Sequence, residues 1–544
     1  MARVSAALVT CSGHATGANV GGSSPMQRQP AFPAFYYVAG FSSLASMTMG
    51  TILGYSGPAL ASLAADSSPI RMTPSQETWF GSILAAGALV GSLATGYLIE
   101  RFGRVRTIQY SSVGFVAGSL CIARCDASLP WLFLGRVLTG FCCGLVSLSV
   151  PVFVSEISPP QVRGLLGSCV QLAITLGILL VFVCGKWLDW LSLALVCTVC
   201  PVFMAISMCF VVESPRWLVA VGERDRALQA LRFLYGPKFS AETECLAIEA
   251  NLGRQSSATL RDLVRRSFSL PLVYTLLLMF FQQFCGINVV TFYSVAIFEA
   301  AGSDIPAADC IILLGVVQVV ATLVATLLMD RAGRRLLMFI SSSAVAFSLV
   351  VLGIFYYVKD LDNGTFSHRY RYVPLASLTT YIAAFCLGVG PVPWVVMGEI
   401  LSPRARGLST GVSTAFCFLC EFIITKEFQD LVSLFHFSGL FWIFAIITLV
   451  QIVFVYVCIP ETKGKSLEDI SQLFQRTPEL SSSVTTLDTV PLHGSRLTLQ
   501  VASRPFSGKH GGDVNSDRGD VHTATDQLGD RGHCRLFHAV VNDE

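Results

Sequence analysis

The sequence predicts an all-α integral membrane protein in which twelve transmembrane helices form two pseudo-symmetric bundles of six. Three observations predict this fold class. Apolar residues make up 53% of the chain and charged residues only 13%, whereas soluble domains carry about 25% charged residues. Twelve apolar runs are long enough to cross hydrocarbon that is about 30 Å thick. Short charged motifs also recur in the same order in both halves of the chain.

The apolar runs fall into two groups of six, separated by a long polar stretch. The predicted spans are 35–55, 76–98, 107–125, 131–154, 166–184, 190–212, 271–298, 310–329, 336–358, 374–398, 408–428 and 437–459. The loops that follow the even-numbered spans are rich in Lys and Arg, as is the polar stretch. Because such loops stay on the cytosolic side, we expect both termini and the polar stretch to be cytosolic.

This pattern divides the chain into six predicted segments. They are a disordered cytosolic N-terminal tail (1–32), a six-helix bundle (33–212), a cytosolic helical linker (213–270), a second six-helix bundle (271–460), a cytosolic C-terminal helix (461–475) and a disordered cytosolic tail (476–544). Amphipathic pieces at 224–236 and 241–266 predict two short helices in the linker. The tails lack any hydrophobic periodicity, which is typical of disorder.

Three charged motifs occur once in each half. "ERFGRVR" (100–106) and "DRAGRR" (330–335) follow the second span of their halves, and "EISPPQVRG" (156–164) and "EILSPRARG" (399–407) follow the fourth. "ESPR" (213–216) and "PETKG" (460–464) end the sixth. Parallel repeats of six helices are typical of transporters in which one bundle rocks against the other.

Two roles are open for the repeated charges. They either set topology and cap helices, or form a cytoplasmic latch of ion pairs that holds the halves together when a central site faces outward. We favour the latch because the motif repeats. The predicted latch residues are Glu100, Arg101, Arg104, Glu156, Arg163, Asp330, Arg334, Arg335, Glu399 and Arg406.

The stretch "FQQFCGIN" places Gln282, Gln283 and Asn288 inside the seventh span. An unpaired amide in hydrocarbon costs about 2–7 kcal/mol, so three amides indicate a polar partner. Amides donate and accept hydrogen bonds without charge, which suits the hydroxyls of a sugar. On a regular helix Gln282 and Asn288 lie about 120° apart, so they converge only if the helix breaks near Gly286. The alternative is that they bond to neighbouring helices.

Glu421 is an ionisable residue inside the eleventh span. Such a side chain costs at least about 2.5–3.5 kcal/mol at the bilayer centre and indicates function. Three states are open for Glu421: a protonated acid, an ion pair with Arg136 or Lys426, or a proton site. Arg136 in the fourth span is interpreted as a structural or gating charge that faces protein.

Six motifs carry a resemblance to the sugar porters of the major facilitator superfamily, in particular the facilitative hexose transporters. They are "GRVLTGFCCG" (135–144), "PVFVSEISP" (151–159), "QQFCGIN" (282–288), "DRAGRR" (330–335), "GPVPW" (390–394) and "PETKGKSLEDI" (460–470). The similarity covers about residues 33–475. A short first exoplasmic loop and the glycosylation sequon at Asn363 resemble the branch called class III, which is common on intracellular membranes.

The resemblance implies a monosaccharide or small disaccharide as substrate, bound near the middle of the membrane. The implied binding residues are Gln171, Gln282, Gln283, Asn288, Gln318 and Trp394. Many relatives carry Asn-Trp where this chain has Cys417-Phe418, which predicts a weaker polar contribution from the eleventh span. "GPVPW", with two prolines, predicts a second broken helix.

Three functions are therefore open: a uniporter of hexoses such as glucose or fructose, a proton–sugar symporter that uses Glu421, and a non-transporting sugar sensor. Proton-coupled relatives typically carry an Asp in the first span, and here "GTILGYSGPAL" (50–60) has no acid, which favours uniport. We find no catalytic motif, cofactor fingerprint or metal-ligand cluster. A net charge of +2 indicates no nucleic-acid partner, and no oligomer is required. The predicted location is the plasma membrane, endosomal–lysosomal membranes, or both.

Overall fold

The computed structural model describes residues 34–65, 70–124, 128–159, 161–237, 239–254, 266–302, 305–362, 369–401 and 406–463. Both predicted tails and Asn363 lie outside the described residues, as does the predicted C-terminal helix from residue 464 onward.

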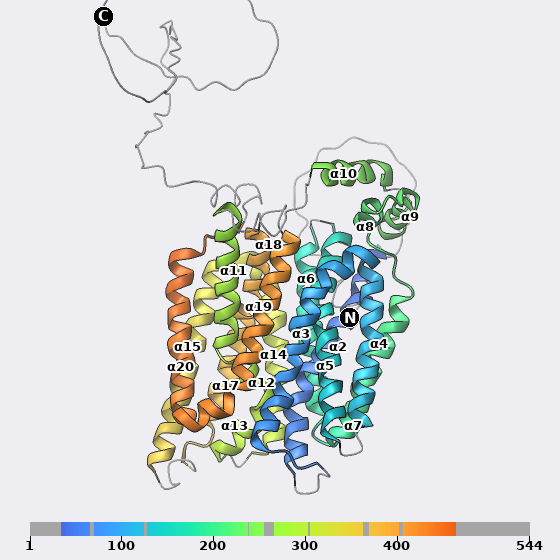
Figure 1. Ribbon diagram of the computed structural model, residues 1–544. Helices are drawn as coiled ribbons and strands as arrows, with labels where there is room; N and C mark the ends of the chain where they lie inside the picture. Colours follow the sequence, from blue (N-terminus) through green and yellow to red (C-terminus); the bar gives the residue numbers. More distant parts are fainter. Residues whose placement is uncertain are drawn as a thin grey trace, which may run out of the picture. The chain divides into compact units, whose positions relative to one another are not determined.

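Within the described residues, the first half contains six long helices (Figure 1). They are α2 (Ala34–Ala64), α3 (Pro74–Phe102), α4 (Arg104–Ala123), α5 (Leu129–Ile157), α6 (Arg163–Cys184) and α7 (Trp190–Met208). Local sequence sets their ends: Thr73 and Gln76 form a capping box ahead of α3. Gly103, at φ +96°, makes the turn between α3 and α4.

The second half repeats this plan with two interrupted spans. Its segments are α11 (Arg266–Phe284), α12 (Ile287–Phe292), α13 (Ser294–Ala301), α14 (Ala307–Ala332), α15 (Arg334–Leu361), α17 (Val373–Ala384), the π-helix η2 (Phe385–Val389), α18 (Val392–Ile400), α19 (Arg406–Lys426) and α20 (Phe428–Cys458). The seventh predicted span comprises α11, α12 and α13, and the tenth comprises α17, η2 and α18.

In the described part of the segment between the halves there are three short helices: α8 (Pro215–Ala220), α9 (Arg224–Tyr235) and α10 (Ala241–Arg254). They share a small apolar core that includes Leu218, Leu231 and Cys245. Figure 1 shows them beyond one end of the long helices. We call that end the linker end, and the end that carries the α6–α7 turn and α13 the opposite end.

The described helices account for all twelve predicted spans. Ten helical segments in the described part are long and apolar enough to cross a membrane. The other two predicted spans correspond to α2 and α4, which are also long helices and contain many Gly, Ser and Thr residues. These small residues suit close contact between helices within a membrane.

Close helix packing in the first half depends on glycines. A Cβ at Gly91 of α3 would lie 2.1 Å from the carbonyl oxygen of Phe141, and one at Gly140 of α5 would lie 2.1 Å from that of Leu84. Any side chain at these positions would force α3 and α5 apart.

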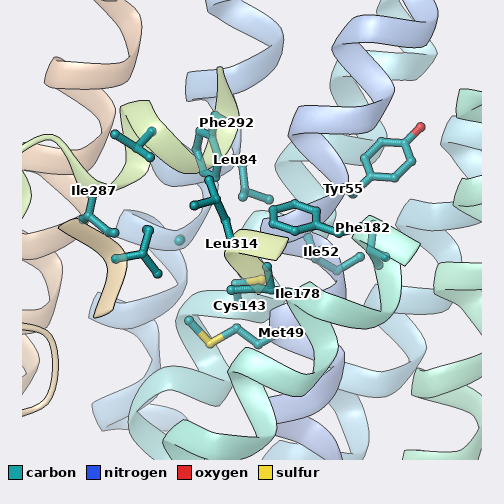
Figure 2. Packing of buried hydrophobic residues seen from close by; sticks show 14 of the residues in the cluster. Met49, Ile52, Tyr55, Leu84, Cys143, Ile178, Phe182, Ile287, Phe292 and Leu314 are labelled. Carbon is teal, nitrogen blue, oxygen red and sulfur yellow. The ribbon is translucent and has the colours of Figure 1, made fainter. Parts of the chain in front are cut away.

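The two halves meet through a large apolar cluster. Figure 2 shows Ile52, Tyr55, Ile178 and Phe182 of the first half near Ile287, Phe292 and Leu314 of the second. Polar and aromatic contacts join the halves at the opposite end. Lys186 pairs with Asp309, and Gln429 donates to Glu77 at 3.1 Å. The Trp79 ring lies 5.9 Å from that of Phe422 and 5.4 Å from Lys426 Nζ.

Candidate functional site

The seventh span breaks at Gly286, which is the break that convergence of Gln282 and Asn288 requires. Helix α11 ends at Phe284, Gly286 adopts φ +93°, and α12 begins at Ile287. L-residues rarely adopt this conformation, and a Cβ at Gly286 would lie 2.6 Å from the ring of Phe444. The break leaves the carbonyl of Cys285 free to accept a hydrogen bond from Tyr381 at 3.0 Å.

The break brings the three amides of this span together. Asn288 donates through Nδ2 to Gln283 Oε1 at 2.6 Å, and Gln283 donates through Nε2 to Cys417 Sγ at 3.0 Å. Gln282 donates through Nε2 to the carbonyl of Gly390 at 2.6 Å. We call Gln282, Gln283 and Asn288 the amide cluster. Only 3% of Gln282 and 6% of Gln283 are exposed, so these partners offset the cost of burying the amides.

The second break supplies the acceptor for Gln282. The π-helix η2 ends at Val389, and α18 begins at Val392. Because Pro393 has no N–H, it cannot donate to the Val389 carbonyl four residues earlier. Gln282 Nε2 lies 3.3 Å from that carbonyl oxygen. The predicted break in "GPVPW" is therefore present, and it exposes backbone acceptors beside the amide cluster.

Sequence reasoning missed the part that Cys417 plays. Its sulfur accepts from Gln283 and lies 3.9 Å from Gln282 Oε1, so α19 does contribute a polar partner. Trp394 lies in the small apolar cluster that contains Cys417. A cysteine in an apolar run is usually interpreted as a small hydrophobe, and only the spacing to Glu421, one helical turn away, could have indicated more.

Gln171 and Gln318 lie apart from this hydrogen-bonded group. They lie on α6 and α14, which pack against each other where Gly315 approaches Leu179. Both glutamines are half-buried. Neither side chain makes a hydrogen bond to another described residue. The structure therefore joins the amides of α11 and α12 but not those of α6 and α14.

The repeated charges form one cluster in each half at the linker end. In the first half, Arg104 makes two hydrogen bonds to the Glu156 carboxylate, at 2.9 and 2.8 Å. Glu213 accepts from the backbone N–H groups of Arg104 at 2.9 Å and Val105 at 3.1 Å, which caps α4. Ser214 links the two acids by donating to Glu156 at 2.5 Å.

The second half repeats this arrangement. Arg334 donates to Glu399 at 3.1 Å, and Glu461 accepts from the N–H groups of Arg334 and Arg335, each at 3.1 Å. The side chains of Asp330 and Arg406 lie outside the described part of the structure. The acid–arginine pairs described here thus lie within the halves, whereas the predicted latch requires pairs between them.

The remaining predicted latch residues of the first half are exposed. Glu100, Arg101 and Arg163 have exposed side chains at the linker end. The Glu100 carbonyl accepts from Trp217 of α8 at 2.9 Å, and Arg163 donates to the Ser158 carbonyl at 3.3 Å. Because they are exposed, these three charged side chains can contact a surface that approaches the linker end.

The two equivalent capping acids have opposite pKa shifts. Burial raises the pKa of Glu213, although its backbone hydrogen bonds act in the other direction. For Glu461 burial also acts to raise the pKa, but the combined N–H groups of Lys463, Arg334, Arg335 and Thr462 outweigh it and lower the pKa. Ionisation of Glu461 therefore stabilises the folded state, whereas ionisation of Glu213 destabilises it.

We expect Glu461→Gln to destabilise the protein at neutral pH by about 1 kcal/mol, as loss of a helix cap does. The difference in the free energy of unfolding between variant and wild type should shrink as pH falls below the ordinary pKa of glutamate, because the wild-type carboxylate then becomes protonated. Glu213→Gln should show the opposite trend: as pH rises, the free energy of unfolding of the variant should increase relative to that of the wild type. Thermal unfolding in detergent at several pH values measures both, and equal pH trends would contradict the prediction.

Glu421 lies on α19 and is buried. It forms no ion pair with Arg136 or Lys426 within the described residues. Lys426 instead lies over the Trp79 ring, and Arg136 is bound by groups of the first half. Glu421 therefore forms neither of the predicted ion pairs within the described residues in this conformation, which leaves a protonated acid and a proton site as its possible states.

Comparison with known proteins identifies the family. The family model described as "Sugar (and other) transporter" matches residues 10–474. The chain belongs to this sugar transporter family. The resemblance to the sugar porters noted in the sequence is thereby confirmed.

Sequence relatives within the sugar transporter family are named as trehalose transporters. A "Facilitated trehalose transporter Tret1" of Culex quinquefasciatus is 42% identical over 436 residues, which cover 79% of this chain and 84% of the relative. The relative of that name from Drosophila pseudoobscura pseudoobscura is 40% identical over 447 residues, or 81% of this chain. The match spans only about half, 51%, of the Drosophila relative's length.

Solved sugar transporter structures share the fold. A proton:xylose symporter XylE bound to 6-bromo-6-deoxy-D-glucose matches with a TM-score of 0.70 at 25% identity, covering 81% of this chain and 99% of that chain. A partially occluded inward-open xylose transporter XylE from E. coli matches with a TM-score of 0.68, also at 25% identity, covering 79% and 99%. The predicted all-α, twelve-helix fold and its multi-pass membrane nature are confirmed. The family also confirms that the chain is not an enzyme.

Proposed function

We propose that this chain is a facilitative sugar transporter that works by alternating access, with the amide cluster as its principal sugar ligands. The observation that carries the proposal is the hydrogen-bonded chain from Asn288 through Gln283 to Cys417, at the point where α11 breaks. Discontinuous helices near the middle of the membrane are where transporters of this architecture bind substrate.

The chemistry of the amide cluster suits a neutral polyol. Each amide offers one acceptor and two donor hydrogens, and each sugar hydroxyl both donates and accepts. A bound sugar can therefore take over hydrogen bonds that the amides make to protein groups, with a small net change in free energy. Such an exchange favours moderate affinity and ready release. Trp394, beside Cys417, offers an aromatic face for a sugar ring.

The contacts between halves support alternating access. The ion pair Lys186–Asp309 and the Glu77–Gln429 hydrogen bond join the halves at the opposite end. Opening that end requires these contacts to break, and the breaks at Gly286 and beside Pro391 give α11 and α17 places to bend. We propose that the linker end, rich in Lys and Arg, faces the cytosol.

The predicted latch, a set of ion pairs between the two halves at the linker end, remains a proposal. When the linker end closes, the exposed charges Glu100, Arg101 and Arg163 would meet the charge cluster of the second half. Individual surface pairs contribute about 0–1 kcal/mol, so several together would be needed to bias the two conformations.

The proposed substrates are trehalose and hexoses. The relatives named above support trehalose, and the amide cluster supports either class because both present only neutral hydroxyls. The word "facilitated" in the relatives' names and the absence of an acid in the membrane part of α2 support uniport. The proton-coupled XylE structure keeps symport as the second candidate.

The test is uptake of radiolabelled trehalose and D-glucose into proteoliposomes, with L-glucose as the control. We expect saturable uptake of at least one of the two sugars that ends at equilibrium, with or without an inward proton gradient. Accumulation above equilibrium only with the gradient would replace uniport by symport. Absence of flux for both sugars, with specific binding retained, would favour the sensor.

A further inference from the structure

Two buried ionisable side chains lie on opposite halves of the molecule without forming an ion pair within the described residues. Arg136 of α5 is 0% exposed and Glu421 of α19 is 4% exposed. Each attracts the other electrostatically, yet no ion pair joins them within the described residues. Charges buried in a membrane protein are usually paired or functional.

Arg136 is held by groups of the first half. Its guanidinium donates to the carbonyls of Ile52 and Phe80, each at 3.4 Å, and to the hydroxyl of Ser56. Its Cζ lies 5.7 Å from the centre of the Tyr55 ring and 4.9 Å from that of Phe80. Carbonyl oxygens and aromatic faces both stabilise a cation, so the positive charge is accommodated without a carboxylate.

Within the described residues, Glu421 has no such set of partners. Its Oε1 atom is buried and makes no hydrogen bond with any described group. Thr425 donates to the backbone carbonyl of Glu421 at 2.6 Å, and this bond does not stabilise a charge on the side-chain carboxylate. A buried carboxylate that is neither hydrogen-bonded nor paired is strongly disfavoured, whereas the protonated acid loses only one hydrogen bond.

In the part of the chain that the structure describes, few groups near Glu421 could stabilise a negative charge. From α5, Arg136 and the thiol of Cys143 interact with it, and from its own helix Cys417 does so. Glu77 of α3 is engaged with Gln429, and Tyr293 donates to the Thr425 carbonyl. Helix α11 faces this part of α19 with Gln283, which does not titrate. Arg136 is thus the cation available to an ionised Glu421.

We propose that Glu421 is a proton-binding site, protonated in this conformation, and that Arg136 becomes its partner when the proton leaves. Deprotonation breaks the carboxylic O–H bond, the proton passes to water, and the resulting carboxylate is attracted to Arg136 across the boundary between the halves. The charge state of Glu421 then alters how strongly α19 and α5 attract each other. Because the halves must separate and close in each transport cycle, sugar flux becomes dependent on pH.

The proton itself can be tested without any sugar. The infrared spectrum of the purified protein at neutral pH should contain the C=O stretching band of a protonated carboxylic acid in apolar surroundings. Glu421→Gln should remove that band, and Glu427→Gln should keep it, because Glu427 is an exposed acid just after the end of the same helix. Absence of the band from the wild type, or its persistence in Glu421→Gln, would overturn the proposal.

The consequence for flux rests on the proposed function and uses the same variants. Exchange of radiolabelled trehalose or D-glucose, with equal pH inside and outside, should change several-fold between mildly acidic and mildly alkaline pH in the wild type and in Glu427→Gln. Glu421→Gln, which resembles the protonated acid, should exchange sugar at a rate that no longer depends on pH. A pH-independent wild type, or unchanged pH dependence in Glu421→Gln, would overturn the coupling to flux. If the wild type moves neither sugar, the proposed function fails, and the infrared result still decides the proton site.

Discussion

Replacing Gln283 with alanine will reduce sugar uptake about tenfold, because this side chain is the centre of the amide cluster. It accepts from Asn288 and donates to Cys417. Its loss removes two hydrogen-bonding directions that a sugar would use, at about 0.5–1.5 kcal/mol each, and about 1.4 kcal/mol corresponds to a factor of ten. The measurement is the initial rate of uptake by proteoliposomes that contain equal amounts of folded protein.

Gln451 provides the matched control. It is a fully buried glutamine on α20, and its side-chain nitrogen and oxygen find no hydrogen-bond partner among the described residues. Gln451→Met keeps the size of the side chain and removes this unsatisfied amide, so uptake should be unchanged and stability equal or slightly higher. Normal uptake by folded Gln283→Ala would show that the amide cluster is only structural.

Gly91→Ala will destabilise the protein by at least about 2 kcal/mol, in the range measured for overpacked interiors. In an ordinary helix this substitution gains up to about 1 kcal/mol of helix propensity. At Gly91, however, the new methyl group would lie 2.1 Å from the Phe141 carbonyl oxygen and 2.9 Å from its carbon. Both are backbone atoms, so α3 and α5 must separate along much of their length.

Gly96→Ala, on the same helix, is the control. Apart from its own stretch of helix, nothing lies within 4 Å of the position that a Cβ would take at Gly96, so only the gain in helix propensity remains and stability should be unchanged or higher. Thermal unfolding in detergent compares the two variants directly. Similar stability of the two would contradict the close packing of α3 against α5.

The comparison of sequence and structure is informative at the amide cluster. The polar residues Gln282, Gln283 and Asn288 stand out inside an apolar span, and their convergence required a break at Gly286, which the structure contains. The partners could not be predicted, because they come from residues more than a hundred positions away: Gly390 on the tenth span and Cys417 on the eleventh. Hydrogen-bond partners depend on which helices become neighbours, and hydropathy carries no information about that.

The charged motifs show the same division. Their repetition predicted two equivalent clusters, and the pairs Arg104–Glu156 and Arg334–Glu399 are equivalent. Which acid pairs with which arginine, and whether a pair lies within a half or between halves, depends on the conformation of the whole bundle. The capping roles of Glu213 and Glu461 also arise only where the segments that follow α7 and α20 reach the first residues of α4 and α15.

By itself, the sequence determined the class of protein, the positions of its helices and the residues that break them. Each of these depends on local properties: the length of an apolar run, a glycine with positive φ, or a proline without an N–H. Only the tertiary structure decided that Cys417 completes the amide cluster, that the halves are joined at the opposite end, and that Arg136 and Glu421 lie unpaired across their boundary. These features depend on contacts between residues far apart in the chain, and such contacts exist only once the helices have packed.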